Sequence, residues 1–187
     1  LLLGVGGTGL WGLARVESIG NEFAAQTHAD TVTLSELRTA IGNVRRFEKD
    51  LLINYDSAGQ QAAYRPKWDK AVEATRAKAR QLAGSNQAAR AAIAARIDAL
   101  LAAYVAQASP VLRQIEVGGF NDAPVANKAI EAAKKQVHQA ELQVTALAEL
   151  LEQETQASSV ARSAVLRDVQ GAFGLVVLAA VVLVVPL

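Results

Sequence analysis

Several polar side chains in the middle of this chain could together hold a small organic anion. Arginine binds a carboxylate through two parallel hydrogen bonds, and a threonine or tyrosine hydroxyl can orient the bound group. Turns are expected near residue 58 and over residues 118–123. Several such groups lie about twelve residues away from those turns along their helices, which corresponds to about 18 Å of helix rise. They are therefore expected at one level of the bundle. These candidates are Arg45, Arg46, Thr75, Tyr104, Gln107, Lys135 and His138.

Arg38 extends this candidate set, because it precedes Arg45 by seven residues and so shares its helical stripe. Thr75 and Tyr104 occupy positions where an apolar residue is expected. The cluster predicts a site between helices for a small di- or tricarboxylate. A structural interpretation stays open, in which the hydroxyls only pack and Arg45 or Arg46 pairs with Glu48 or Asp50 on its own helix.

Other chemistry is scarce in the sequence. The chain has no cysteine, which excludes disulfides, thiol catalysis and zinc–thiolate sites. Its two histidines, His28 and His138, lie far apart, so no metal site is expected. The sequence shows no recognisable Ser-His-Asp catalytic triad. The net charge of +1 gives no field that would attract nucleic acid. We therefore expect neither an enzyme nor a cofactor.

The segment GVGGTG, residues 4–9, has the spacing of a dinucleotide-binding turn. Such a turn needs a strand before it, but only three residues precede Gly4. Small residues also recur every fourth position at Gly4, Thr8 and Gly12, which is the spacing that lets membrane helices approach closely. We interpret the segment as a helix-packing surface.

Apolar residues between residues 34 and 151 follow a heptad spacing that predicts helices. In the first helix, Glu48 takes a place in the apolar seam between Val44 and Leu51. The predicted seam residues are Leu34, Leu37, Ile41, Val44, Leu51 and Tyr55; then Trp68, Val72, Thr75, Ala79 and Leu82; then Ile93, Ile97, Leu100, Tyr104, Ala108, Val111 and Ile115; and finally Ile130, Ala133, Val137, Ala140, Val144, Leu147 and Leu151.

Turn residues separate these segments. Pro66 suits the first turn of the second helix, Ser85 the N-cap of the third, and Pro110 is expected to kink the third. The fourth helix is expected to run unbroken from Pro124, and the β-branched stretch 30–36 to loosen the first. Because short connections make neighbouring helices antiparallel, the fold class is all-α, an antiparallel up-down-up-down four-helix bundle. A long two-stranded coiled coil is the alternative.

The two ends of the chain carry no charge. The stretch 169–187 is long enough to cross a bilayer core, which takes roughly 20 apolar residues as a helix. The shorter stretch 1–14 is interpreted as a first span that is cut short, with a signal peptide as the competing interpretation. The predicted domains are thus a membrane helix at 1–14, a helical sensory domain at 15–168 and a second membrane helix at 169–187.

The stretch LRTAIGNVRRFEKDLLINYDS, followed by YRPKWDKAVEATRAKARQL, resembles the four-helix-bundle ligand-binding domain of methyl-accepting chemotaxis proteins. The resemblance implies a periplasmic sensor in the inner membrane, dimeric through its first helix, with its ligand near the distal end. In aspartate-sensing members, first-helix arginines hold the ligand with a fourth-helix threonine. The spacing of Arg38, Arg45 and Arg46 departs from that pattern, so an organic acid is expected rather than an amino acid.

These features predict a receptor that binds a small carboxylate and signals through a small displacement of its fourth helix relative to its first. The expected partners are the membrane, a second copy of the chain and, as a further possibility, a periplasmic binding protein. Two alternatives stay open. The chain could be the input domain of a sensor kinase or cyclase, or a structural or docking bundle without a ligand.

Overall fold

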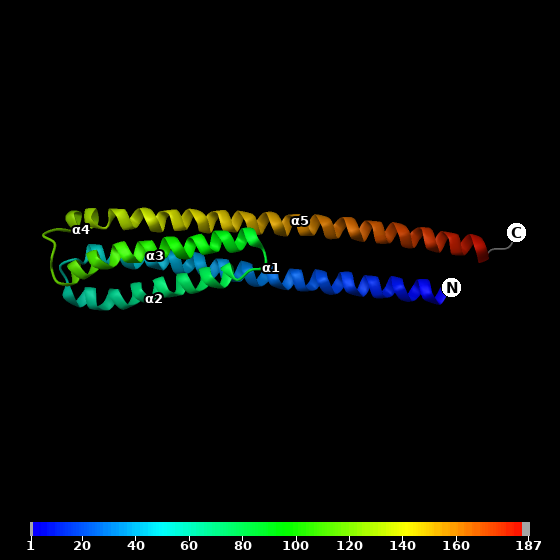
Figure 1. Cartoon of the computed structure of the whole chain (residues 1–187), viewed down its shortest axis with the longest axis horizontal. Coiled ribbons are helices and arrows are strands. Elements are labelled where there is room, and N and C mark those ends of the chain that lie inside the picture. Colours follow the sequence, from blue (N-terminus) through cyan, green and yellow to red (C-terminus); the bar gives the residue numbers. More distant parts are fainter. Residues whose placement is uncertain (1, 185–187) are drawn as a thin grey trace. The chain divides into compact units, whose positions relative to one another are not determined.

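The computed structural model describes residues 2–184, with side chains mainly between residues 25 and 161, and over this range the chain is all-α without a strand (Figure 1). It divides into two units, residues 1–149 and residues 150–187. The helices are α1 (Leu2–Ile53), α2 (Ala58–Ala83), α3 (Ala88–Glu116), α4 (Ala123–Ala129) and α5 (Glu131–Val184). The predicted all-α class is therefore confirmed.

Within residues 1–149, α2 packs antiparallel to α1 and α3 packs antiparallel to α2. Glu36 of α1 pairs with Lys78 near the end of α2. Phe47, which lies later in α1, contacts Tyr64, which lies earlier in α2. Along α2 and α3, Trp68 is hydrogen-bonded to Tyr104, while the later Arg76 is hydrogen-bonded to the earlier Asp98. Short connections of this kind force consecutive helices to reverse direction. As a consequence, α1 and α3 run parallel to each other.

One apolar stripe on each long helix forms the core of this unit. In α1, α2 and α5 the buried positions follow the predicted heptad seam closely, although Tyr55 is only half-buried. In α3 four of the predicted seam residues are buried, namely Ile97, Tyr104, Ala108 and Ile115. The other three, Ile93, Leu100 and Val111, are half-buried, and the residue that follows each of them is buried instead: Ala94, Leu101 and Leu112.

Among the described residues, α3 is the one helix whose length and hydropathy would suffice to cross a membrane. Alanine supplies much of this hydropathy. In the structure α3 packs along α2, and its buried stripe begins with Arg90. On composition alone the helix is compatible with membrane association.

The two predicted spans lie at the outer ends of α1 and α5. The backbone is helical over residues 2–14 and 169–184, while residues 1 and 185–187 and nearly all the side chains of these segments lie outside the described part. The GVGGTG segment is thus within a continuous helix and is not a strand-to-helix turn. Its predicted role in helix packing stays a prediction.

The α1–α2 turn differs from the expected one. Helix α2 begins at Ala58, so Pro66 lies inside it and not in its first turn. The cause is the buried side chain of Gln61, whose amide donates to the backbone carbonyls of Leu51 and Asn54, both at 2.7 Å. Leu51 is in the last turn of α1, where carbonyls lack a partner within the helix, and Asn54 lies just beyond that helix, where its carbonyl also accepts from the backbone N–H of Ser57. Gln61 thereby joins the two helix ends and lets α2 start early.

Other local expectations also require correction. The fourth helical segment is interrupted at Ile130, which separates α4 from α5. The stretch 30–36 stays helical, and within it the hydroxyls of Thr31 and Thr33 donate to backbone carbonyls four residues earlier. The N-cap of α3 is Gln87 and not Ser85. Pro110 lies inside α3, as expected, and the kink there stays a prediction.

Replacing Leu37 with alanine tests the core. The Leu37 side chain is fully buried, so Leu37→Ala should lower the free energy of unfolding by about 3 kcal/mol. The matched control is Leu142→Ala on α5, where the side chain is 48% exposed and the change should be below about 0.5 kcal/mol. Urea denaturation of the purified chain, followed by circular dichroism, measures both. Equal losses in the two variants would contradict the packing.

Candidate functional site

The carboxylate of Glu48 is the centre of a buried polar network. Glu48 lies in the apolar seam of α1 and is only 2% exposed. Its Oε2 atom accepts a hydrogen bond from the hydroxyl of Tyr104 on α3 at 2.8 Å, and its Oε1 atom accepts one from Nη1 of Arg45 at 2.7 Å. The indole Nε1 of Trp68 on α2 in turn donates to the Tyr104 oxygen at 2.8 Å. The carboxylate therefore has direct partners on α1 and α3, and α2 is linked to it through Tyr104.

The network reaches α5 through the outer side of Arg45. Its Nε lies 3.7 Å from Oε1 of Glu141, and Oε2 of Glu141 lies 3.5 Å from Nδ1 of His138. We call the six residues Arg45, Glu48, Trp68, Tyr104, Glu141 and His138 the Glu48 network. It contains side chains from α1, α2, α3 and α5, so displacement of any one of these helices would disturb it.

Tyr104 acts in this network as a permanent hydrogen-bond donor. Burial, followed by the negative charge of Glu48, raises the pKa of Tyr104 far above its ordinary value of 10.0. The hydroxyl thus keeps its proton under physiological conditions. Its oxygen can accept from Trp68 while its proton is directed at Glu48, and this orders the three side chains in one chain of bonds.

The structure brings three of the eight candidate anion-binding residues together in this network: Arg45, Tyr104 and His138. Their polar groups face protein partners, which matches the structural interpretation in which Arg45 pairs with Glu48. His138 is largely exposed at the end of the network.

The other five candidates lie outside it. The hydroxyl of Thr75 donates to the backbone carbonyl of Ala71 at 2.7 Å. The side chain of Arg46 is 72% exposed, lies 4.0 Å from Asp50 and stacks 5.8 Å from the centre of the Phe47 ring. Arg38 and Gln107 are exposed, as is Lys135. In the sequence, Glu48 stood out only as a seam residue and a pairing partner of an arginine, and Trp68 only as a seam residue, while Glu141 was missed. The signal for the network was the carboxylate in a heptad seam, which requires partners.

A second buried ion pair ties α1 to α3. Nη1 of Arg90, which is 1% exposed, lies 2.5 Å from Oδ2 of Asp30, and Gln26 donates to the other carboxylate oxygen. Asp30 precedes Glu48 by about five helical turns on α1, just as Arg90 precedes Tyr104 on α3 by about four. The Asp30–Arg90 pair and the Glu48–Tyr104 hydrogen bond thus join α1 to α3 at two positions along their length, and together they fix the register of these parallel helices.

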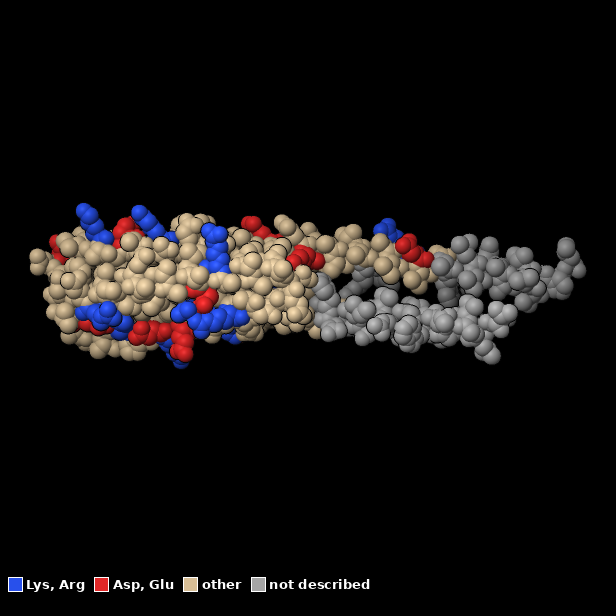
Figure 2. Space-filling model, in the orientation of Figure 1, with Lys and Arg blue, Asp and Glu red and all other residues tan. Residues whose placement is uncertain are grey.

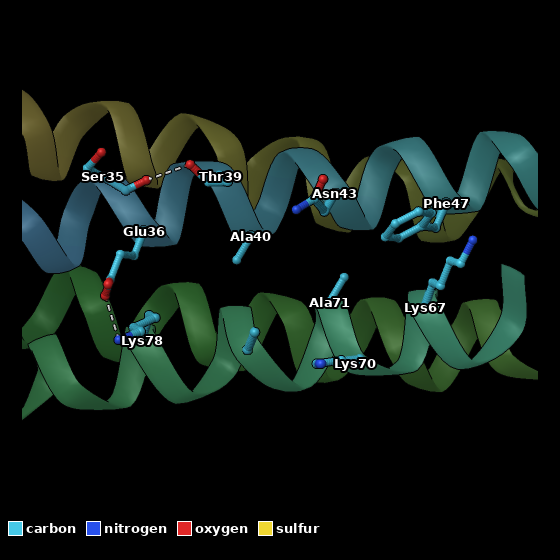
Figure 3. A pocket seen from close by; sticks show the side chains of 11 residues that line it. Ser35, Glu36, Thr39, Ala40, Asn43, Phe47, Lys67, Lys70, Ala71 and Lys78 are labelled. Atoms are coloured by element: carbon cyan, nitrogen blue, oxygen red, sulfur yellow. Dashed lines mark hydrogen bonds and ion pairs between the residues drawn. The ribbon is translucent and has the colours of Figure 1, made fainter.

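An open groove lies between α1 and α2, with a volume of about 530 Å³ (Figure 3). Small side chains line its length, and Phe47 lies at one end. Its basic residues are Lys67, Lys70 and Lys78, and its one acidic residue, Glu36, pairs with Lys78 at 2.5 Å. Figure 3 shows Glu36 and Lys78 directed at each other, and Lys67 reaching from α2 toward Phe47.

Acidic and basic side chains are mixed over the face shown in Figure 2. Asp98 of α3 illustrates the pairing, because Nε of Arg76 and Nε of Arg80 lie 2.7 and 3.1 Å from its carboxylate oxygens. Burial alone would raise the pKa of Asp98. The hydrogen bonds and charges of the two arginines outweigh it and hold the pKa below the ordinary value of 3.8.

Comparison with known proteins identifies no relative. No protein-family model, no curated protein and no solved structure matches this chain. Within the part of the chain that the structure describes, no group of three histidine, cysteine, aspartate or glutamate side chains is placed to hold a metal ion. The site must therefore be interpreted from its own contacts.

Replacing Tyr104 with phenylalanine tests the Glu48 network. The variant removes the donor to Glu48 and the acceptor for Trp68, so the free energy of unfolding should fall by about 2 kcal/mol. Tyr55→Phe is the matched control and should change it by less than about 0.5 kcal/mol, since Tyr55 is only half-buried. Denaturation that showed Tyr104→Phe to be as stable as the unmodified chain would contradict the network.

Replacing Asp98 with asparagine tests the surface pairing through its pH dependence. Because the pKa of Asp98 is lowered in the fold, its ionised form stabilises the folded state above pH 3.8, and that contribution is lost as the pH falls through the lowered pKa. The variant should be less stable by about 1 kcal/mol at pH 7, and the difference should disappear in acid. Thermal unfolding between pH 2 and pH 7 measures this.

The matched control for that pH series is Asp56→Asn, at an exposed position in the α1–α2 turn. Its effect on unfolding should be small at every pH. A pH-independent loss in Asp98→Asn would show that the carboxylate's charge is not the source of the stabilisation.

Proposed function

We propose that this chain is the sensory domain of a transmembrane receptor of the methyl-accepting chemotaxis type, without enzymatic activity of its own. In this proposal, residues 15–168 form an antiparallel up-down-up-down four-helix bundle in the periplasm, and the uncharged segments 1–14 and 169–187 cross the inner membrane. The ligand is a small organic acid. The chain works as a homodimer, and a periplasmic binding protein is a further candidate partner.

The observation that carries the proposal is the continuity of two helices. Helix α1 is unbroken from Leu2 to Ile53, and α5 is unbroken from Glu131 to Val184. Each therefore joins core residues to an uncharged end of the chain through a single helix. A helix transmits a small translation or rotation along its length, because its backbone hydrogen bonds resist local deformation. This arrangement suits a signal that starts in the packed region and ends at the membrane.

The Glu48 network offers a way for a carboxylate to start such a signal. Arg45 is 34% exposed, and its guanidinium is shared between Glu48 of α1 and Glu141 of α5. A dicarboxylate ligand bound to Arg45 would compete with both. Glu141 and α5 would then lose a contact with α1, so the ligand would favour a different position of α5 relative to α1.

A structural or docking bundle without a ligand is the second candidate. It is favoured by the hydrogen bonds of Thr75 and Tyr104, which find partners inside the protein. A ligand at Tyr104 would have to displace a buried carboxylate. The two functions differ in one respect, since only the sensor binds a small molecule through Arg45.

Calorimetry of the full chain in lipid nanodiscs tests the sensor proposal, with succinate, malate and citrate as probes. At least one of them should bind, and Arg45→Lys should weaken its binding about tenfold because lysine cannot form the bidentate contact. The control variant is Arg113→Lys, at an exposed position of α3. The absence of binding by all three acids, or equal binding by Arg45→Lys, would favour the structural bundle.

A further inference from the structure

The α1–α2 groove has a different chemistry from that of the Glu48 network, and the two share no residue. Alanine side chains, at Ala40, Ala71 and Ala74, leave room between the two helices. The volume of about 530 Å³ lies within the range of small-molecule sites, roughly 300–1,000 Å³. The groove can therefore be assessed independently of the proposed function.

Positive charge is left unneutralised at one end of this groove. Lys78 is paired with Glu36, whereas Lys67 and Lys70 have no carboxylate within ion-pair distance among the residues that the structure describes. The two lysines are three residues apart on α2, which corresponds to about 4.5 Å of helix rise. In Figure 3 only Lys67 extends toward Phe47, but both lysine side chains are exposed and leave neighbouring positions of one helix face, so both can reach a single anion with two neighbouring carboxylates.

Two aromatic rings, those of Phe47 and Tyr64, lie near Lys67. The rings of Phe47 and Tyr64 lie 6.5 Å apart between centroids, and the ammonium of Lys67 lies 5.0 Å from the centre of the Tyr64 ring. Both rings are half-buried, so each keeps an accessible surface. A flat aromatic ligand could stack on the exposed part of Phe47, a contact that an aliphatic acid cannot make.

A polar group without a partner completes the end of the groove. The half-buried amide of Asn43 lines it from α1 and makes no hydrogen bond to any described residue. In Figure 3, Asn43 and Phe47 lie one turn apart on α1, across from the segment of α2 that carries Lys67 and Lys70. The amide could donate to a carboxylate while its carbonyl accepts from water.

We infer that this end of the α1–α2 groove is a binding site for an aromatic dicarboxylate. Phe47 provides the stacking surface, Lys67 and Lys70 bind the two carboxylates, and Asn43 orients one of them. The two lysines favour a ligand with two negative charges over an uncharged aromatic molecule. The ring of Phe47 favours an aromatic ligand over an aliphatic dicarboxylate.

Calorimetry of the full chain in lipid nanodiscs tests this inference with phthalate as the probe. Phthalate should bind. Lys67→Gln and Lys70→Gln should each raise its dissociation constant about fivefold, and Phe47→Leu should do the same. Benzamide, which has the ring without the charge, and succinate, which has the charges without the ring, should bind at this site at least about tenfold more weakly.

The control variant is Lys135→Gln, which removes an exposed lysine of α5 outside the groove and should leave phthalate binding unchanged. Circular dichroism confirms that each variant is folded. The inference is overturned if phthalate does not bind, or if it binds equally to the Lys67→Gln, Lys70→Gln and Lys135→Gln variants. Because Arg45→Lys alters no groove residue, its phthalate affinity should equal that of the unmodified chain, which separates this site from the proposed organic-acid site.

Discussion

The buried carboxylate of Glu48 is the constraint on which the packing of these helices depends. Removal of a charge from water costs several kcal/mol unless nearby groups replace the lost hydration. Here the replacements are the hydroxyl of Tyr104 and the guanidinium of Arg45, at 2.8 and 2.7 Å. Arg45 is on the same helix as Glu48, but the contact with Tyr104 exists only when α1 and α3 lie in one relative position. The cost of leaving Glu48 without partners therefore discriminates against other alignments.

Discrimination between alternative alignments of the helices matters in a core that contains so much alanine. Fully buried positions include Ala79, Ala94, Ala108 and Ala140, and small side chains of this kind interdigitate little. Apolar contact alone would then distinguish poorly between alignments that differ by one turn. The Glu48 network and the Asp30–Arg90 pair supply this selectivity at two levels of α1 and α3. We regard them as the elements that set the register, while apolar burial supplies most of the stability.

The heptad pattern was sufficient to predict the all-α class and the seams of α1, α2 and α5, because burial of one stripe is a local property of a helix. In α3 it was right for Ile97 and Tyr104 but off by one position at Leu100, because Leu101 is adjacent and periodicity alone does not decide which of the two faces the core. The early start of α2 depends on Gln61 reaching back to α1, a contact between residues ten positions apart that no propensity encodes.

The candidate site could be predicted only in part, for a related reason. The sequence placed Arg45, Tyr104 and His138 at one level along the helices, and the structure brings them into one network. It could not show that a carboxylate of the protein itself, Glu48, takes the place where a ligand carboxylate was expected. The α1–α2 groove also escaped notice, since Phe47, Lys67 and Lys70 have the composition of an ordinary helix surface until the two helices are placed side by side.

A double-mutant cycle between Glu48 and Tyr104 tests the central claim most directly. The free energy of unfolding would be measured for Glu48→Leu, for Tyr104→Phe and for the double variant. If the hydrogen bond between these residues holds α1 and α3 in register, the double variant should lose about 2 kcal/mol less than the sum of the two single losses, because neither partner is then left buried alone. Additivity within about 0.5 kcal/mol would contradict the account.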